Sequence, residues 1–350
     1  MNERIAIVGA GAVGAYVGGY FSRAGEDVTL IDPWPENVNA INEGGLNLYG
    51  LTEAECFNAP AKAIHLTDVQ SLKKTAPIDI AFVCTKSFDT AWATMMIQDY
   101  LSPNGYVVSL QNCINEETIA KVVGWGRVVG CIAAKIAVEL TGPAEVKRGV
   151  PLGGNSHTVF RVGEVHGRIT ERVERICGML AGVDSAKTTT NLWGERWSKL
   201  CANAHQNGVS AASGLGNNGC ARDPDVRWLQ IRICGEAAAI GKALGYDLEK
   251  IGKFTGDEWI AAWKGDATQR QTIEAEMLAA CEGRSEESRP SMAQDIAKGR
   301  RTEIDYINGF IAEKGAEIGI DAPANRGLVT AVHAVERGEL PPAPERVTSI

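Results

Sequence analysis

The stretch that most constrains the fold is residues 5–32, IAIVGAGAVGAYVGGYFSRAGEDVTLID. It reads as a strand, a glycine-rich turn, a helix and a second strand, in that order. Gly9, Gly11 and Gly14 give the spacing G-x-G-x-x-G at the turn, and Asp32 ends the second strand. A strand–turn–helix–strand unit of this kind predicts a parallel sheet with helices packed on it.

Each part of this unit has a mechanical role in binding a dinucleotide. The first glycine allows a tight turn, the second lets a pyrophosphate approach the backbone, and the third lets the helix pack closely. Free N–H groups at the start of the helix attract phosphates. An acid about 20 residues after the glycines accepts hydrogen bonds from the ribose hydroxyls of NAD. The predicted cofactor-binding residues of this unit are therefore Gly9, Gly11, Ala12, Val13, Gly14 and Asp32.

Two other interpretations of this uncharged stretch are a glycine turn that serves packing alone and a secretory signal. Residues 5–21 contain five glycines, which interrupt any continuous apolar core. The flank carries one acid and one base, Glu3 and Arg4, whereas a secretory signal has a basic flank. The strand–turn–helix–strand context favours the dinucleotide site over both alternatives.

Composition limits the remaining function classes. At 350 residues the chain exceeds an average domain, which favours two domains. Its net charge of -8 argues against nonspecific binding to nucleic acid or to an anionic membrane. The nine cysteines include no C-x-x-C pair and the five histidines are scattered. We therefore expect reduced thiols, a cytoplasmic location and no metal site.

The first half of the chain alternates strand and helix patterns. Apolar strand patterns cover residues 78–86, 105–112 and 127–138, with helical stretches between them. Lys86 and Asn112 lie at strand ends. Because ligands of parallel α/β sheets bind past the carboxyl ends of the strands, both residues are candidates for the predicted crevice.

The pattern changes to helices alone from Trp193 onward. We therefore predict an N-terminal Rossmann-type parallel sheet domain, residues 1–188, and an all-helical C-terminal domain, residues 189–350. Antiparallel strands within residues 139–168 are expected to complete the first domain. The helices predicted for the second domain cover 193–211, 223–245, 257–263, 267–282, 291–298, 302–318 and one segment near 325–337.

The predicted helix 193–211 carries a stripe of polar residues. Lys199, Asn203 and Asn207 are spaced by four and share one helix face, and Gln206 falls on the same face. Burying such a stripe is costly without partners. The stripe is therefore either a solvated surface or a functional polar pocket, and the pattern alone leaves both open.

Residues 289–315 form the second block of interest. Ser291 is a candidate N-cap of a helix, with Gln294 at the capping-box position. Glu303 begins a further amphipathic helix, where the helix dipole favours an acid. An ordinary structural role is thus available to both residues.

Together these motifs resemble the ketopantoate reductase (2-dehydropantoate 2-reductase) family over nearly the whole chain. The resemblance is carried by the glycine fingerprint, by L-Q-N at 110–112, by the lysine and asparagines of the polar stripe, and by S-M-x-Q-D-I…R-T-E-I-D-x-I-N-G at 291–309. It implies a Rossmann domain, a helical domain and an active site in the cleft between them. It also implies NAD(P)-dependent hydride transfer between a 2-oxo acid and a 2-hydroxy acid, and a homodimer.

The resemblance extends to individual residues. It implies that Lys199 is the catalytic general acid, that Glu303 is its partner, and that Asn112 lies near the nicotinamide and the substrate. A lysine with a reference pKa of about 10 is charged at neutral pH and can donate a proton to the forming alkoxide. Ser291 is expected to hold the substrate carboxylate. The resemblance further places Asn203, Asn207 and Asn217 at the substrate and Lys86 near the cofactor, and the polar stripe adds Gln206 to the predicted substrate-binding residues.

The sequence departs from the family pattern at several positions. The segment I-D-P-W-P-E-N around Asp32 has no Lys or Arg, where NADPH-using members carry a basic residue that meets the 2′-phosphate. A carboxylate repels that phosphate, so NAD is the preferred cofactor and NADP remains possible. Cys113 replaces the glycine of Q-N-G, Gly208 stands where proline is common, and residues 255–288 add length. The last three changes touch the substrate side and keep open a dehydrogenase of another polar or sugar-like hydroxy acid. A non-catalytic dinucleotide sensor is a separate alternative, and the joint presence of a proton donor, its partner and a carboxylate anchor argues against it.

Overall fold

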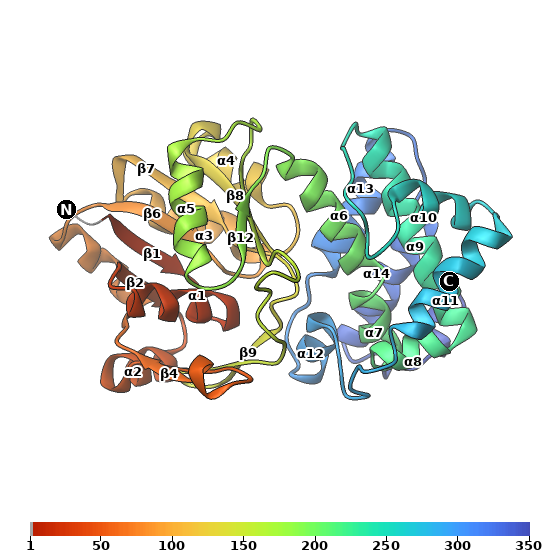
Figure 1. Cartoon of the computed structure of the whole chain (residues 1–350), viewed down its shortest axis with the longest axis horizontal. Helices are drawn as coiled ribbons and strands as arrows, with labels where there is room; N and C mark the ends of the chain where they lie inside the picture. Colours follow the sequence, from red (N-terminus) through yellow and green to blue (C-terminus); the bar gives the residue numbers. More distant parts are fainter. Residues whose placement is uncertain (1–2) are drawn as a thin grey trace. The chain divides into compact units, whose positions relative to one another are not determined.

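The computed structural model describes residues 3–350, and the chain divides into two compact units, Met1–Leu192 and Trp193–Ile350 (Figure 1). The first unit is built on a largely parallel sheet covered by helices, and the elements named after it are helices. The predicted fold class, a Rossmann-type domain followed by a helical domain, is therefore confirmed. Within residues 3–350, no helix is long and apolar enough to cross a membrane.

The main sheet of the first unit consists of β1 (Arg4–Val8), β2 (Asp27–Asp32), β5 (Lys62–His65), β6 (Ile78–Val83), β7 (Leu101–Ser109), β8 (Val128–Ala133), β11 (Phe160–Glu164) and β12 (Ala186–Thr188). Their order is β12-β11-β8-β7-β6-β1-β2-β5. The strands from β8 to β5 are parallel, and β11 runs antiparallel to β8. The order reverses between β1 and β6, and ligands of open α/β sheets bind at such a reversal.

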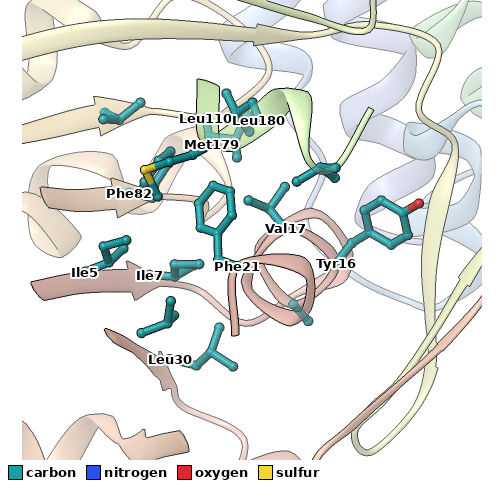
Figure 2. Packing of buried hydrophobic residues seen from close by; sticks show 14 of the residues in the cluster. Ile5, Ile7, Tyr16, Val17, Phe21, Leu30, Phe82, Leu110, Met179 and Leu180 are labelled. Carbon is teal, nitrogen blue, oxygen red and sulfur yellow. The ribbon is translucent and has the colours of Figure 1, made fainter. Parts of the chain in front are cut away.

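The sheet separates two hydrophobic clusters. Because successive side chains of a strand point to opposite faces, Ile5 and Ile7 of β1 join one cluster and Ala6 joins the other. Figure 2 shows the first cluster, in which Ile5 and Ile7 are buried together with Phe21 of a helix. The α-helices of this unit are α1 (Ala12–Arg23), α2 (Pro35–Gly44), α3 (Thr90–Gln98), α4 (Glu116–Val123) and α5 (Glu171–Ala181).

A second, smaller sheet joins parts of the first unit that are far apart in the sequence. It consists of β3 (Leu46–Tyr49), β4 (Phe57–Ala59), β9 (Val138–Gly142) and β10 (Glu145–Arg148), in the order β4-β3-β10-β9. The antiparallel strands expected within residues 139–168 are present, but β9 and β10 belong to this second sheet and only β11 extends the main one.

The strand expected over residues 127–138 is shorter than predicted. β8 ends at Ala133, and Lys135 and Ala137 adopt left-handed φ angles of 57° and 36°. A left-handed residue breaks the extended geometry of a strand, so the chain leaves the main sheet here before it enters β9.

The helices named from the domain boundary onward are α6 (Leu192–Ala204), α7 (Asn207–Ser213), α8 (Asn217–Arg222), α9 (Pro224–Ala243), α10 (Gly256–Trp263), α11 (Ala267–Ala279), α12 (Ser291–Ala297), α13 (Phe310–Glu317), α14 (Pro323–Glu336) and α15 (Glu345–Thr348). A π-helical turn, η5 (Asp305–Gly309), precedes α13. Neither α8 nor α15 is foreseen by the sequence pattern.

Two of the predicted helices are interrupted. The helix expected over 193–211 divides into α6 and α7 at Gln206, whose N–H donates to the Asn203 carbonyl over 3.2 Å. This bond reaches only three residues back and closes α6 with a tight turn. The helix expected over 302–318 begins instead with the π-helical turn η5, which contains one more residue per hydrogen-bonded ring than an α-helix.

Candidate functional site

The three glycines of the turn after β1 have distinct environments. Gly9 has a φ of +97°, which favours glycine, and its N–H donates to the Ile31 carbonyl of β2 over 2.8 Å. A Cβ on Gly14 would lie 2.0 Å from the Gly9 carbonyl oxygen and 3.0 Å from Cβ of Cys84. A Cβ on Gly11 would meet no described atom within 4 Å. Gly14 is therefore needed for packing, whereas Gly11 faces open space.

The N-terminus of α1 begins in this open space. Gly11 is its N-cap, and among the described residues no side chain caps the helix and no acid lies in its first turn. Ala12 and Val13, the first helical residues, are partly exposed. The first N–H groups of a helix have no partners inside it, so this end of α1 can bind an anion.

Asp32 lies at the carboxyl end of β2 and is 7% exposed. Its Oδ2 accepts a hydrogen bond from the Ala10 N–H over 2.8 Å, and its Oδ1 accepts one from the Trp34 N–H over 3.0 Å. Burial raises the pKa of the Asp32 carboxyl, and these two N–H donors oppose the rise. In the neighbouring strand β5, His65 lies opposite Asp32 in the strand register. The Nε2 of His65 donates to the Pro33 carbonyl over 2.8 Å.

Asn37 is a supporting residue that sequence reasoning missed. It is 0% exposed, its Nδ2 donates to the Ala10 carbonyl over 3.3 Å, and its Oδ1 accepts from the Ala144 N–H over 2.8 Å. Asn37 thereby ties the glycine turn to the β9–β10 turn. No local signal distinguishes it from a surface asparagine of α2, because both of its partners are distant in the sequence.

The residues at this edge of the sheet fit a dinucleotide. Open space over Gly11 suits a pyrophosphate, and the free N-terminus of α1 attracts its charge. Asp32 stands at the end of the neighbouring strand, where a ribose is bound in folds of this type. Among the described residues, no cluster of three or more His, Cys, Asp or Glu side chains is placed to hold a metal ion.

Lys86 and Asn112 lie in the loops that follow β6 and β7, and both are partly exposed. The buried side chain of Asn115 connects these loops. Its Nδ2 donates to the Asn112 carbonyl over 2.8 Å and to Oγ of Ser87 over 3.2 Å. Both candidate residues therefore belong to one edge of the main sheet, the edge at which the glycine turn also lies.

The next residue, Cys113, has a left-handed φ of 66° and is buried. This conformation favours glycine, the residue for which Cys113 substitutes in the Q-N-G pattern. The thiol therefore occupies a position where the backbone disfavours any side chain.

The polar stripe of the second unit follows α6 into α7. Lys199 and Asn203 are partly exposed on α6, and Asn207, the first residue of α7, is 8% exposed. Gln206 lies in the turn between the helices and is exposed. The break thus separates Gln206 from the half-buried face that the other residues share.

The loop that precedes α12 connects the positions of Asn217 and Ser291. Asn217 is the first residue of α8, and its Nδ2 donates to Oγ of Ser288 over 2.9 Å. Ser291 is the first residue of α12 and is exposed, and Pro290 is the N-cap. The predicted capping role of Ser291 is therefore wrong, because the helix starts one residue earlier than a Ser291 cap requires, and no side-chain bond caps it within the described chain.

Glu303 is 5% exposed and lies two residues before the π-helical turn η5, whose N-cap is Ile304. Its backbone carbonyl accepts from the N–H groups of Tyr306 and Ile307, each over 3.0 Å. The neighbouring residue Ile304 also packs on the start of α7, since a Cβ on Gly208 would lie 3.0 Å from Cδ1 of Ile304. The structure therefore brings the segment that carries Glu303 against the α6–α7 junction.

Comparison with protein families gives two matches. The family model described as Ketopantoate reductase PanE/ApbA matches residues 5–158, and the model for the C-terminal part of the same family matches residues 191–336. The 2-dehydropantoate 2-reductase of Archaeoglobus fulgidus is 30% identical over 349 residues, which cover 96% of this chain and 99% of the relative. That of Pyrococcus horikoshii is 31% identical over 345 residues, 95% of this chain and 97% of the relative.

Solved structures show the same similarity. The PanE/ApbA family ketopantoate reductase of Ralstonia eutropha superposes with a TM-score of 0.77 at 27% identity, over 96% of this chain and 99% of that one. D-mandelate dehydrogenase in a ternary structure with NADH and anilino(oxo)acetate gives a TM-score of 0.77 at 23% identity, over 96% and 99%. The latter identity supports likeness of fold alone.

Proposed function

Because the chain belongs to the ketopantoate reductase PanE/ApbA family of NAD(P)-dependent CH–OH oxidoreductases, we propose that it interconverts a 2-oxo acid and a 2-hydroxy acid with NAD(H) as the preferred cofactor. The observation that carries the proposal is the glycine turn, which is open at Gly11 and closed at Gly14. Asp32 beside this turn supports the cofactor preference.

The proposed cofactor residues are Gly9, Gly11, Ala12, Val13, Gly14, Asp32, Lys86 and Asn112. The segment P-W-P-E-N after Asp32 offers one acid, Glu36, and two prolines but no Lys or Arg to meet a 2′-phosphate. A carboxylate favours free ribose hydroxyls over that phosphate. The structural likeness to D-mandelate dehydrogenase, which was solved with NADH, is in line with this preference.

The proposed chemistry assigns proton transfer to the second unit. The bound nicotinamide supplies the hydride that reduces the carbonyl carbon of the 2-oxo acid. Lys199 donates a proton to the carbonyl oxygen as it becomes an alkoxide, and its charge stabilises the oxyanion beforehand. Glu303 holds the ammonium group in place. Asn112 is proposed to lie near the reacting groups.

The proposed substrate-binding residues are Ser291, Asn203, Asn207, Asn217 and Gln206. Ser291 is exposed at the start of α12, and its hydroxyl is proposed to bind the substrate carboxylate. The amide groups suit a polar substrate. Relatives named 2-dehydropantoate 2-reductase favour ketopantoate as that substrate. The alternative is another polar or sugar-like hydroxy acid, because Cys113 and Gly208 depart from the family pattern.

The test is a rate comparison of NADH with NADPH at fixed protein concentration, using a panel of 2-oxo acids that includes ketopantoate. The proposal expects turnover with a higher kcat/KM for NADH, and loss of kcat in Lys199→Ala. A higher kcat/KM for NADPH would overturn the cofactor preference. Binding of NADH without turnover of any acid would favour the dinucleotide sensor instead. A homodimer and a cytoplasmic location are further parts of the proposal.

A further inference from the structure

Asn308, within the π-helical turn, connects two elements that are distant in the sequence. It is 0% exposed. Its Nδ2 donates to the Ala204 carbonyl over 3.2 Å and to Oδ1 of Asn325 over 3.0 Å. Ala204 is the last residue of α6, the helix that carries Lys199 and Asn203. One amide thus joins the end of the lysine helix to the turn that follows Glu303.

A buried polar chain fixes Asn308 from the other side. Asn325, in the first turn of α14, is 0% exposed, and its Nδ2 donates to Oε2 of Glu236 over 2.9 Å and to the Ile233 carbonyl over 3.2 Å. Glu236, on α9, is 1% exposed and also accepts from the backbone N–H groups of Ala324 and Asn325, each over 3.0 Å. The Asn325 amide is therefore held in one orientation, with its oxygen toward Asn308.

The orientation matters because the Asn308 amide group makes both of its bonds as a donor. Ala204 and Asn325 each present an acceptor oxygen to it. Its own Oδ1 is buried without a hydrogen-bond partner among the described residues. An unsatisfied buried oxygen is unfavourable, and the π-helical turn that contains Asn308 has poorer hydrogen-bond geometry than an α-helix. The fold thus retains the buried Oδ1 of Asn308, unpartnered within the described chain, and a π-helical turn at the point where the end of α6 meets η5.

We propose that Asn308 is a positioning residue that holds the end of α6 against the π-helical turn, and so fixes Lys199 relative to Glu303. The proposal rests on the proposed function, because it takes Lys199 as the proton donor and Glu303 as its partner. Lys199 precedes Ala204 by five residues on a continuous helix, so a shift of the helix end moves the lysine with it. Gly208 and Ile304 pack closely at the same junction, but apolar packing has no preferred direction. The Asn308 hydrogen bonds therefore set the direction in which α6 is held.

The first test compares Asn308→Ala with a control that loses stability elsewhere. Thr255 caps α10 through a complete capping box and belongs to neither the polar chain nor the proposed site, so Thr255→Ala provides the control. We expect Asn308→Ala to lower kcat by about 10- to 100-fold, because small misplacements of catalytic groups have effects of that size. The affinity for NADH, measured by fluorescence titration, and the KM for NADH should stay within twofold. Thr255→Ala, compared at equal distance below its own Tm, should keep its kcat.

The second test asks whether Asn308 acts through Glu303. If it does, Glu303→Gln and Asn308→Ala combined should lower kcat hardly more than Glu303→Gln alone, and Asn308→Ala should shift the pH profile of kcat. A purely structural role would give multiplicative losses and an unchanged profile. If Asn308→Ala does not fold, Asn325→Ala removes the outer part of the polar chain, including its bonds to Glu236 and Ile233, and keeps the Asn308–Ala204 bond. We expect from it a smaller loss of kcat with the same profile shift.

These outcomes separate the two proposals. Equal kcat for Asn308→Ala and Thr255→Ala, with Lys199→Ala inactive, would overturn the positioning role and leave the proposed chemistry standing. Full activity of Lys199→Ala would overturn the proposed chemistry itself.

Discussion

The backbone N–H of Ala10 donates a 2.8 Å hydrogen bond to the carboxylate of Asp32, which joins the glycine turn directly to the end of β2. The second carboxylate oxygen is held by the Trp34 N–H at 3.0 Å. The acid that is proposed to bind the ribose is thus oriented by the same turn that is proposed to receive the pyrophosphate. Such preorganisation reduces the conformational cost of binding a dinucleotide.

Gly11 and Gly14 of the turn are predicted to respond oppositely to the same substitution by alanine. Gly11→Ala should fold with nearly unchanged Tm, because its new Cβ meets no described atom within 4 Å, but it should weaken NADH binding by at least about tenfold by blocking the pyrophosphate. Gly14→Ala should lower Tm strongly, because its Cβ would lie 2.0 Å from the Gly9 oxygen. Thermal melts and NADH fluorescence titration of both variants provide the check. Tight NADH binding by a well-folded Gly11→Ala would contradict the proposed phosphate site.

Asp32→Asn should reduce the discrimination between cofactors. The amide keeps the side-chain shape but loses the charge, and hydrogen bonds to charged groups contribute roughly 1.5–3 kcal/mol. We therefore expect the kcat/KM ratio of NADH to NADPH to fall by about 10- to 100-fold. Steady-state kinetics with both cofactors measure the ratio. Glu43→Gln, an exposed acid in the last turn of α2 and outside the segment that follows Asp32, is the charge-matched control and should leave the ratio unchanged.

The parts of the fold that the sequence predicted are those specified by short-range patterns. The strand–turn–helix–strand unit at 5–32 is recognisable because its glycines and Asp32 act within one continuous stretch. The second sheet was not predicted as a separate sheet, since β10 pairs with β3, and Glu145 lies opposite Asn47 from a distant part of the chain. Local periodicity contains no information on such a pairing.

The same limit applies to the second unit. The four-residue spacing of Lys199 and Asn203 correctly placed both on one helix, but nothing near Ala204 indicated that its carbonyl bonds to Asn308. The break between α6 and α7 and the π-helical turn are therefore invisible to periodicity. The resemblance to a family supplied residue roles that neither spacing nor composition contained.

The buried side chain of His205 is expected to reduce the free energy of unfolding at acidic pH. It is 6% exposed, its ring lies 5.2 Å from that of Trp259, and burial lowers its pKa from about 6.5 to about 4. The unfolded state therefore takes up a proton between about pH 6.5 and pH 4 before the folded state does, so stability is full above this window and falls as pH decreases through it. We expect this residue to contribute about 2–3 kcal/mol to the difference in unfolding free energy between pH 7 and pH 4.5. Urea unfolding at both pH values measures the difference, which should be smaller in His205→Gln by that amount; equal differences in parent and variant would rule out the effect.

Removing one partner of the buried ion pair between Arg148 and Asp184 should cost a large part of the free energy of unfolding. Their side chains are 0% and 1% exposed and lie 2.6 Å apart, and Asp184 also accepts from the Gly153 N–H over 2.9 Å. Asp184→Asn leaves the guanidinium buried without its counter-charge, and removal of one partner of a buried pair typically costs about 3–5 kcal/mol. Glu3→Gln is the matched control, because Glu3 forms an ion pair with Arg175 in which the Glu3 side chain is 39% exposed and the Arg175 side chain 38%. Such a surface pair should contribute less than about 1 kcal/mol to the free energy of unfolding. Urea unfolding at neutral pH compares the variants, and similar losses for both would mean that the Arg148 charge finds another partner once Asp184 is neutral.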